Sequence, residues 1–154
     1  TGLLLHPLDG RPNRMIYPYT SESQFERIHR FEVSPDGSRL AISGFLTTNG
    51  SALHIVAAGG EVELARGEPP EMLVIQGWSA DGTSIFFTTL NTNAPPPHEL
   101  WRISVAGGDP QKIGELASAT QINPVAIHPN GSAVAFTAGT PLRELWRMDH
   151  FLPD

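Results

Sequence analysis

The chain of 154 residues contains no cysteine. This absence excludes disulfide bonds, zinc sites built on cysteine and a thiol nucleophile. It leaves the compartment open, because proteins without cysteine occur both inside and outside cells. Any catalytic or metal-binding role must therefore rest on other side chains.

Positive charge is also scarce. One lysine, Lys112, and nine arginines stand against sixteen acidic residues, so the formal net charge is −6. Binding to phosphate groups needs a basic footprint, so we do not expect nucleic acid as a direct partner of this chain. No basic run suggests a patch for a membrane surface. No apolar run is long enough for a spanning helix, so we expect no membrane insertion.

The N-terminal residue is Thr1, and no secretory signal peptide is visible. We therefore expect the chain to be an excised or processed piece of a longer protein.

No segment has a sustained apolar period of 3.6 residues, so almost no helix is expected. The best candidate for a single helical turn is 21–28. Fifteen glycines and fourteen prolines are spread along the chain at turn positions. That distribution, with a hydrophobic content of 40%, favours a folded domain of many short strands joined by tight turns.

One short phrase occurs three times. The copies are Ser34–Ser38, Ser79–Thr83 and His128–Ser132. They are about 45 and about 49 residues apart, which is the period of four-stranded propeller blades. Each contains Asp-Gly or Asn-Gly between two apolar runs, and we interpret this pair as a type I′ hairpin turn with positive φ at both central residues. The glycines predicted to have positive φ are Gly37, Gly82 and Gly131.

The first two repeats predict four strands each, and the third predicts three. The first strand of every repeat precedes the turn, at 30–33, 74–78 and 124–127, and the second follows it, at 39–43, 84–88 and 133–137. The third lies at 52–56, 99–103 and 144–148, and the last two copies share Glu-Leu-Trp-Arg. A Gly-Gly turn and a fourth strand follow at 61–65 and 110–114.

The N-terminal segment matches the second half of a repeat. Leu3 to Ile16 aligns without gaps on Leu100 to Ile113, which predicts the third and fourth strands of an earlier blade. We therefore predict an all-β chain, a single β-propeller fragment of about three four-stranded antiparallel blades in an incomplete ring. Its predicted parts are a half blade at 1–28, blades at 29–70 and 71–118, and an incomplete blade at 119–154.

Asp36, Asp81 and Asn130 recur in the turns and could suggest calcium binding. Calcium sites need clustered oxygen ligands such as D-x-D-x-D-G, and each turn here has at most one acid. We favour the interpretation that these side chains accept backbone N–H bonds within the turns.

Other residues with catalytic potential lack supporting patterns. The six histidines show no HxH or HExxH spacing. There is no G-x-S-x-G elbow, and the Gly-Gly pairs open no G-x-G-x-x-G loop. We predict no catalytic residues, no metal ligands, no cofactor and no enzymatic activity. We expect His98, in the proline-rich loop, to be exposed and His128 to be structural.

The three tryptophans, Trp78, Trp101 and Trp146, could form a binding surface. Because Trp101 and Trp146 occupy equivalent positions in their repeats, packing between blades is the favoured interpretation. Arg102 and Arg147 alternate to the opposite face of their strands. We expect them to pair with Glu99 and Glu144 or with acids on neighbouring strands.

The repeats resemble those of the TolB-like, WD-repeat-like bacterial β-propellers, in which an apolar residue precedes Ser-Pro-Asp-Gly and a later Leu-Trp strand precedes Gly-Gly. Phe31 to Ile42 is the best match. Ala80 replaces the proline in the second copy, and His128 and Asn130 replace Ser and Asp in the third. The resemblance covers nearly the whole chain and implies a periplasmic or extracytoplasmic location.

The segment 144–153 looks like the closing line of propellers at the C-terminus of large bacterial proteins. Those propellers follow a winged-helix DNA-binding domain or a Ser/Thr kinase domain. The resemblance implies that this chain is the C-terminal part of a sensor or interaction domain.

Two functions follow from this reasoning. The first is a non-catalytic scaffold that binds a protein or peptide through loops on a rigid frame. The alternative is the gating, substrate-access portion of a prolyl-oligopeptidase-like peptidase whose catalytic domain is absent from this chain, or a kinase-linked sensor. The chain is also a possible assembly unit, and we expect a homodimer through the broken propeller ends, or aggregation, unless a parent protein supplies the missing blades.

Overall fold

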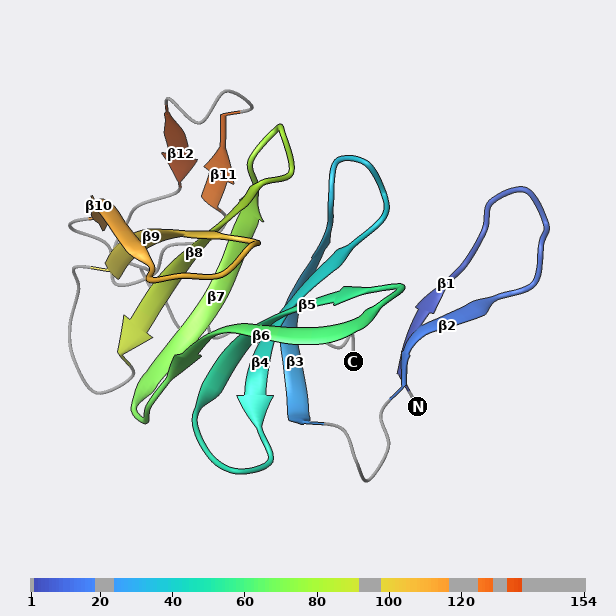
Figure 1. The fold of residues 1–154 in the computed structure, drawn as a ribbon, viewed down its shortest axis with the longest axis horizontal. Helices are drawn as coiled ribbons and strands as arrows, with labels where there is room; N and C mark the ends of the chain where they lie inside the picture. Colours follow the sequence, from blue (N-terminus) through green and yellow to red (C-terminus); the bar gives the residue numbers. More distant parts are fainter. Residues whose placement is uncertain (1, 19–23, 92–97, 117–124, 129–132, 137–154) are drawn as a thin grey trace, which may run out of the picture.

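Twelve antiparallel strands make up the described part of the chain, and none of its residues is helical (Figure 1). The computed structural model describes residues 2–18, 24–91, 98–116, 125–128 and 133–136. Strands that are consecutive in the sequence are neighbours in every sheet. The prediction of an all-β chain with four-stranded antiparallel sheets is confirmed.

The strands form four sheets in succession. The N-terminal half-blade contains β1 (Gly2–Leu5) and β2 (Arg14–Pro18). The first blade contains β3 (Phe25–Val33), β4 (Leu40–Leu46), β5 (Ser51–Ala57) and β6 (Gly60–Gly67). The second blade contains β7 (Glu71–Trp78), β8 (Ser84–Asn91), β9 (His98–Ser104) and β10 (Gln111–Leu116). The last hairpin contains β11 (Val125–Ile127) and β12 (Val134–Phe136).

The half-blade has the same register as the third and fourth strands of the two blades. Leu4 lies opposite Met15, as Trp101 lies opposite Lys112. In each of these two sheets the ladder then skips one residue, Ile16 or Ile113. The first blade has the same skip, at Leu64. The gapless alignment of Leu3 to Ile16 on Leu100 to Ile113 is therefore confirmed residue by residue.

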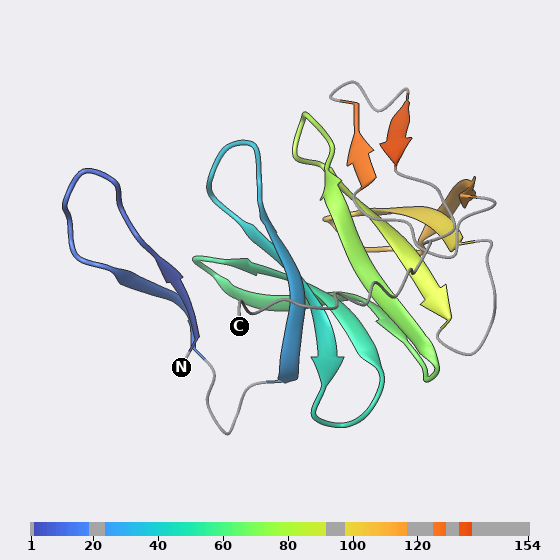
Figure 2. The same cartoon turned by 180° about the vertical axis from the view of Figure 1, so that it is seen from behind.

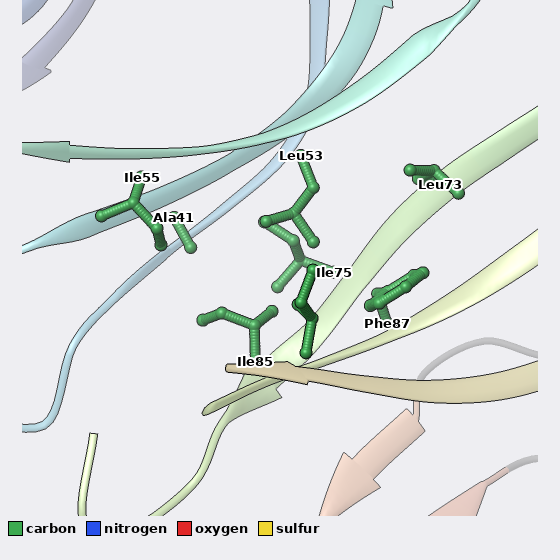
Figure 3. Close-up of a cluster of buried hydrophobic side chains, with 8 residues drawn as sticks. Ala41, Leu53, Ile55, Leu73, Ile75, Ile85 and Phe87 are labelled. Atoms are coloured by element: carbon green, nitrogen blue, oxygen red, sulfur yellow. The ribbon is translucent and has the colours of Figure 1, made fainter. Parts of the chain in front are cut away.

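The sheets stack face to face, and three apolar clusters fill the spaces between them. The cluster between the half-blade and the first blade contains Tyr17, Phe25, Leu40, Ile42, Leu46 and Ala52. The cluster between the two blades contains Ala41, Leu53, Ile55, Leu73, Ile75, Ile85, Phe87 and Ile103 (Figure 3). The cluster between the second blade and the last hairpin contains Leu100, Leu116 and Val125.

The half-blade and the last hairpin lie at opposite ends of this row, with the two blades between them (Figure 1, Figure 2). The row is open at both ends in the described part of the chain. It is consistent with the predicted incomplete ring.

The Asp-Gly turns differ from the predicted type I′ geometry. Gly37 and Gly82 have φ of 72° and 67°, as predicted, but Asn49 is the one described residue other than glycine with positive φ. Asp36 and Asp81 therefore do not share the left-handed conformation. In the first turn, the Gly37 N–H donates to the Ser34 carbonyl at 2.8 Å, so Pro35 and Asp36 are the two central residues. Gly131 lies outside the described residues.

Polar contacts join the two blades at the same end as these turns. The Arg39 guanidinium Nη2 donates to the Gly82 carbonyl at 2.7 Å, and its Cζ lies 5.1 Å from the centre of the Trp78 ring. The Trp78 indole donates to the Glu32 carbonyl at 3.0 Å. These contacts form a clamp between successive blades, which we call the Arg39 clamp.

Two buried serines of the first blade contact the backbone of the second. The Ser51 hydroxyl oxygen accepts from the Leu73 N–H at 3.0 Å and donates to the Glu71 carbonyl at 3.1 Å. The Ser43 hydroxyl accepts from the Ile75 N–H at 3.3 Å. These bonds satisfy backbone groups along β7, the edge strand of its sheet.

Two local predictions are wrong. The helical turn expected at 21–28 is not formed over Phe25 to Ile28, because these residues begin β3 and pair with β4. Phe25 is buried in the apolar cluster between the half-blade and the first blade. His98 is half-buried as the first residue of β9, whereas we expected it to be exposed.

The third strand predicted at 144–148 lies outside the described residues, and the blade limits stay predictions.

The described residues include no helix that is both long enough and apolar enough to span a membrane.

Gly37 and Gly82 provide a matched pair for testing the Arg39 clamp. A Cβ at Gly37 would meet nothing within 4 Å, whereas a Cβ at Gly82 would lie 3.2 Å from Arg39 Nη2. We expect Gly37→Ala to cost about 1 kcal/mol for its left-handed backbone, and Gly82→Ala to cost more because Arg39 must shift. Urea denaturation measures the loss in free energy of unfolding for each variant. When Arg39→Ala is also present, the two losses should become equal. Equal costs in the natural background would contradict the clamp.

Candidate functional site

The repeated turn acid Asp36 is held by its own turn. Its carboxylate accepts from the Ser38 N–H at 3.0 Å, from the Ser38 hydroxyl at 2.8 Å and from the Ser34 hydroxyl at 2.6 Å. The Ser34 oxygen in turn accepts the Arg39 N–H at 2.9 Å. These hydrogen bonds, with that from Ser34 contributing most, hold the pKa of Asp36 well below its ordinary value.

Asp81 repeats this arrangement in the second turn. Its Oδ1 accepts from the Ser79 hydroxyl at 2.7 Å, the Thr83 N–H at 3.0 Å and the Thr83 hydroxyl at 2.8 Å. The Ser79 hydroxyl bond, followed by those from Thr83, lowers the pKa of Asp81 to about 2. Both acids are therefore turn residues that accept backbone N–H bonds, in agreement with the favoured interpretation. Asn130 lies outside the described residues.

One histidine, His54, lies deep in the seam between the half-blade and the first blade. Its ring is fully buried, with Nδ1 2.7 Å from Glu61 Oε1 and Nε2 3.3 Å from Glu63 Oε2. The Tyr17 hydroxyl also donates to Glu61, at 3.2 Å. Burial acts to raise the pKa of Glu63, but Arg66 and His54 outweigh it and lower that pKa.

Metal binding finds no support at His54 or elsewhere in the described ranges, where no group of three or more His, Asp or Glu side chains could hold an ion. His54 in the first blade is the equivalent of Trp101 in the second. Each lies opposite the residue that comes just before the skipped one, which is Leu64 in the first blade and Ile113 in the second. It serves to join β2, β5 and β6.

Trp78 and Trp101 are half-buried and pack against the cluster between the two blades. This agrees with the favoured packing interpretation. The Arg102 guanidinium donates to the amide of Gln111 at 2.9 Å, while Glu99 pairs with Lys112 at 2.6 Å. The expected pairing of Arg102 with Glu99 is wrong, because residues three apart in a strand lie on opposite faces, and Glu99 shares its face with Trp101 and Lys112. Trp146 lies outside the described residues.

A small cavity lies where the first strands of the two blades meet. We call it the first-strand cavity; its volume is about 230 Å³. It is lined by His29 and Arg30 of β3, Met72, Val74 and Gln76 of β7, and Thr88 and Leu90 of β8. The volume is below the roughly 300–1,000 Å³ of small-molecule sites, so it suits one side chain or a small group.

The polar wall of the first-strand cavity is a chain of hydrogen bonds across the seam. Arg30 Nη1 donates to Gln76 Oε1 at 3.4 Å, and Gln76 Nε2 donates to Thr88 Oγ1 at 2.9 Å. Arg30 Nε also donates to Glu32 at 3.3 Å. Gln76 and Thr88 are buried, so this wall is held in place by packing.

Positive charge at the cavity comes from arginine. Burial, and then the charge of Arg27, lower the pKa of His29 below 6.5, so His29 is neutral at neutral pH. The rings of His29 and Phe45 lie 4.8 Å apart, and Arg27 lies 5.0 Å from the centre of the Phe45 ring. The first-strand cavity thus combines one cation, three neutral polar side chains and three apolar ones.

Sequence reasoning missed this cavity. Arg30 and Gln76 are 46 positions apart and belong to different sheets. A ladder irregularity in β3 between Ile28 and Arg30 places His29 out of register. The alternating polar residues of β3 were the one available signal.

A larger hollow of about 610 Å³ lies on the second blade, beside the Asp81 turn, Arg102 and Lys112. It is lined partly by Phe86, which pairs with Arg102 on the face opposite the first blade. The strand predicted at 144–148 would pack on this face, so we do not assign the hollow to a ligand.

Successive four-stranded antiparallel meanders, stacked face to face with equivalent turns at one end, define part of a β-propeller. No family model matches the sequence, and no curated protein matches it.

Solved structures share the fold, and two of them match most of this chain. A protein from Agrobacterium tumefaciens described as a TolB has a TM-score of 0.62 and 22% identity, over 86% of this chain and 44% of its own. An oligogalacturonate lyase from Vibrio parahaemolyticus has a TM-score of 0.61 and 17% identity, over 85% of this chain and 36% of its own. The chain has the fold of part of a TolB-like β-propeller, and it spans less than half the length of either structure.

The turn hydrogen bonds predict an unusual titration of Asp81. Its folded-state pKa of about 2 lies below the ordinary 3.8, so its ionised form stabilises the fold above about pH 4, and this contribution is lost as the pH falls toward 2. Carboxyl titration by NMR should give a midpoint near 2, and Ser79→Ala should raise it.

Ser34→Ala is the matched control, because it should raise the midpoint of Asp36 and leave that of Asp81 unchanged. An Asp81 midpoint that is insensitive to Ser79→Ala would show that the hydroxyl is not the cause.

Proposed function

We propose that the chain is a non-catalytic propeller scaffold that binds a protein or peptide, and that the first-strand cavity receives one side chain of that partner. The cavity is the observation that carries the proposal. Its size fits a side chain. Its polar wall is held by a buried hydrogen bond within the second blade, from Gln76 to Thr88, and by a part-buried one between the two sheets, from Arg30 to Gln76. Such preorganised recesses lower the cost of binding.

The lining residues select the chemistry of the anchor. Met72, Val74 and Leu90 suit an apolar stem, while Arg30 and Gln76 suit a carboxylate or amide at its end. A glutamate or glutamine side chain has both parts. We therefore infer a partner segment that presents one of these residues.

The whole-protein context belongs to the same proposal. A bacterial parent with this module as its C-terminal sensor or interaction part agrees with the likeness to the TolB structure. The lyase from Vibrio parahaemolyticus shows that this fold also occurs in an enzyme. No observation on this chain favours the peptidase-gating role over the binding role.

Selection of random heptapeptides displayed on phage tests the binding role. The intact chain should enrich peptides that share a Glu or Gln anchor. Arg30→Ala should lower the affinity of the chain for the enriched peptides about tenfold or more, because a charge-assisted hydrogen bond to the peptide is lost. Met72→Trp should also weaken them by filling the cavity, while Arg14→Ala, an exposed arginine of the half-blade, should have no effect.

Two results would count against the proposal. One is a set of enriched peptides whose binding is unchanged in both cavity variants, and the other is the absence of any enrichment. Turnover of oligogalacturonate by the purified chain, lost in a point variant, would replace the scaffold with an enzyme.

A further inference from the structure

The half-blade is held on the first blade by few buried groups. Among the side chains of β1 and β2 that the structure describes, only Tyr17 is buried, with 5% of its surface exposed. Leu3 and Ile16 are partly buried beside it. The seam between the two blades, by contrast, buries eight apolar residues in one cluster. The attachment of the half-blade therefore depends strongly on Tyr17.

The Tyr17 hydroxyl ends in a chain of polar contacts centred on His54. It donates to Glu61 Oε1 at 3.2 Å, and the same oxygen lies 2.7 Å from His54 Nδ1. On the other side of the ring, His54 Nε2 lies 3.3 Å from Glu63 Oε2. Arg66 closes the chain, because its Nη2 pairs with the same Glu63 oxygen at 2.7 Å. The anchor of the half-blade is thus connected to one imidazole ring.

The His54 ring is shielded from solvent, and both of its nitrogens face carboxylates. The centre of the Phe25 ring lies 4.6 Å from its own, and Ile42 lies opposite it in the sheet. Among the described residues, His54 Nε2 is the one buried side-chain nitrogen or oxygen without a hydrogen bond. An ionised carboxylate only accepts hydrogen bonds, and a neutral imidazole has one N–H. A neutral ring that donates to Glu61 therefore leaves the Nε2 lone pair against an oxygen of Glu63.

A second ring proton converts this repulsion into attraction. With a proton on both nitrogens, the ring faces Glu61 and Glu63 as a cation, and charge-assisted contacts of this kind are the strong ones. Two positive groups, His54 and Arg66, then balance the two carboxylates. With a neutral ring, the same partly buried cluster carries an excess negative charge, which is unfavourable away from water.

The carboxylates keep their charge where a histidine ordinarily titrates. Burial raises the pKa of Glu63, but the hydrogen bonds and charges of Arg66 and His54 outweigh burial and lower that pKa. Glu63 is therefore ionised in mild acid. Histidine is the side chain whose charge ordinarily changes between about pH 5 and 8.

We propose that His54 is a proton-dependent latch between the half-blade and the first blade. When both ring nitrogens carry a proton, the ring bridges Glu61 and Glu63 and holds Glu61 in position to accept from Tyr17. When one proton leaves, the contact with Glu63 becomes repulsive, and the half-blade separates from the first blade more often. The latch therefore holds in mild acid and weakens as the pH rises.

The seam between the two blades has no equivalent latch. Trp101 takes the place of His54 there, and its indole N–H, which does not titrate, donates to Glu99 at 3.2 Å. The pH response should thus be confined to the half-blade. It is independent of the binding role proposed for the first-strand cavity, which lies between the two blades.

Hydrogen exchange of the unmodified chain tests the latch. Protection factors correct for the effect of pH on the exchange chemistry, and they report local opening. We expect the amides of β1 and β2 to be about threefold or more better protected at about pH 5.5 than at about pH 8, relative to those of β8. Equal relative protection at the two pH values would overturn the latch.

Three variants identify the titrating group. His54→Gln keeps a polar side chain but cannot take up a proton, so the pH response should disappear. Glu63→Gln removes the charge that faces Nε2, so the response should shrink. The control is His6→Gln, because His6 belongs to the half-blade itself and lies 2.6 Å from Asn13; here the response should remain. A response that persists in both of the first two variants, or that is lost in the control, would contradict the proposal.

Nitrogen NMR of the ring provides a readout that a merely structural histidine would not move. His54 should show two protonated ring nitrogens at the lower pH and one at the higher, with the same midpoint as the change in protection. Glu63→Gln should move this midpoint to lower pH, because the charge that favours the second proton is gone. The Glu63 side chain is 32% exposed, so this variant should remain folded even if His54→Gln does not, which circular dichroism checks. A ring with one N–H at both pH values would exclude the latch.

Discussion

The structure depends on the burial of both faces of each sheet. In the first blade the adjacent residues Ala41 and Ile42 are both fully buried, one in the cluster shared with the second blade and one in the cluster shared with the half-blade. A single four-stranded sheet would leave one of these faces in water. Each blade is therefore stable only in the company of its neighbours, as in other arrays of repeats.

Buried polar groups then set the spacing between the sheets. The hydroxyls of Ser43 and Ser51 receive backbone N–H groups of β7 that would otherwise be unsatisfied in the seam. An unsatisfied buried group costs about 1–3 kcal/mol, so the seam tolerates little change in distance. The Arg39 clamp and the wall formed by Arg30 and Gln76 act at the same seam. The candidate binding cavity exists because two sheets are held in this fixed relation.

The fold could be predicted because its signals are local. Turn residues, strand lengths and the spacing of the repeats lie within a few residues of one another or recur with a period. The alignment of Leu3 to Ile16 on Leu100 to Ile113 predicted two equivalent strands, and the two ladders have the same register, because equivalent sequences form equivalent ladders.

The errors arise where partners distant in the sequence decide the conformation. Phe25 extends into a strand because it pairs with Leu46, against the local preference for a turn. The first-strand cavity needs contacts between residues of two sheets, and no period in the sequence reports them.

In the described sheets, each pair of third and fourth strands has one skipped residue, which affects the outer edge of the blade. Ile16, Leu64 and Ile113 each interrupt the regular ladder at the same place, and a bulge of this kind bends and twists its strand. The outer strands β6 and β10 also carry charged side chains on mostly exposed positions. A bent, charged edge is a poor template for strands from other molecules, so the rim resists amyloid-like growth. The bulge that bends each blade therefore also makes its outer strand a poor site for the addition of further strands.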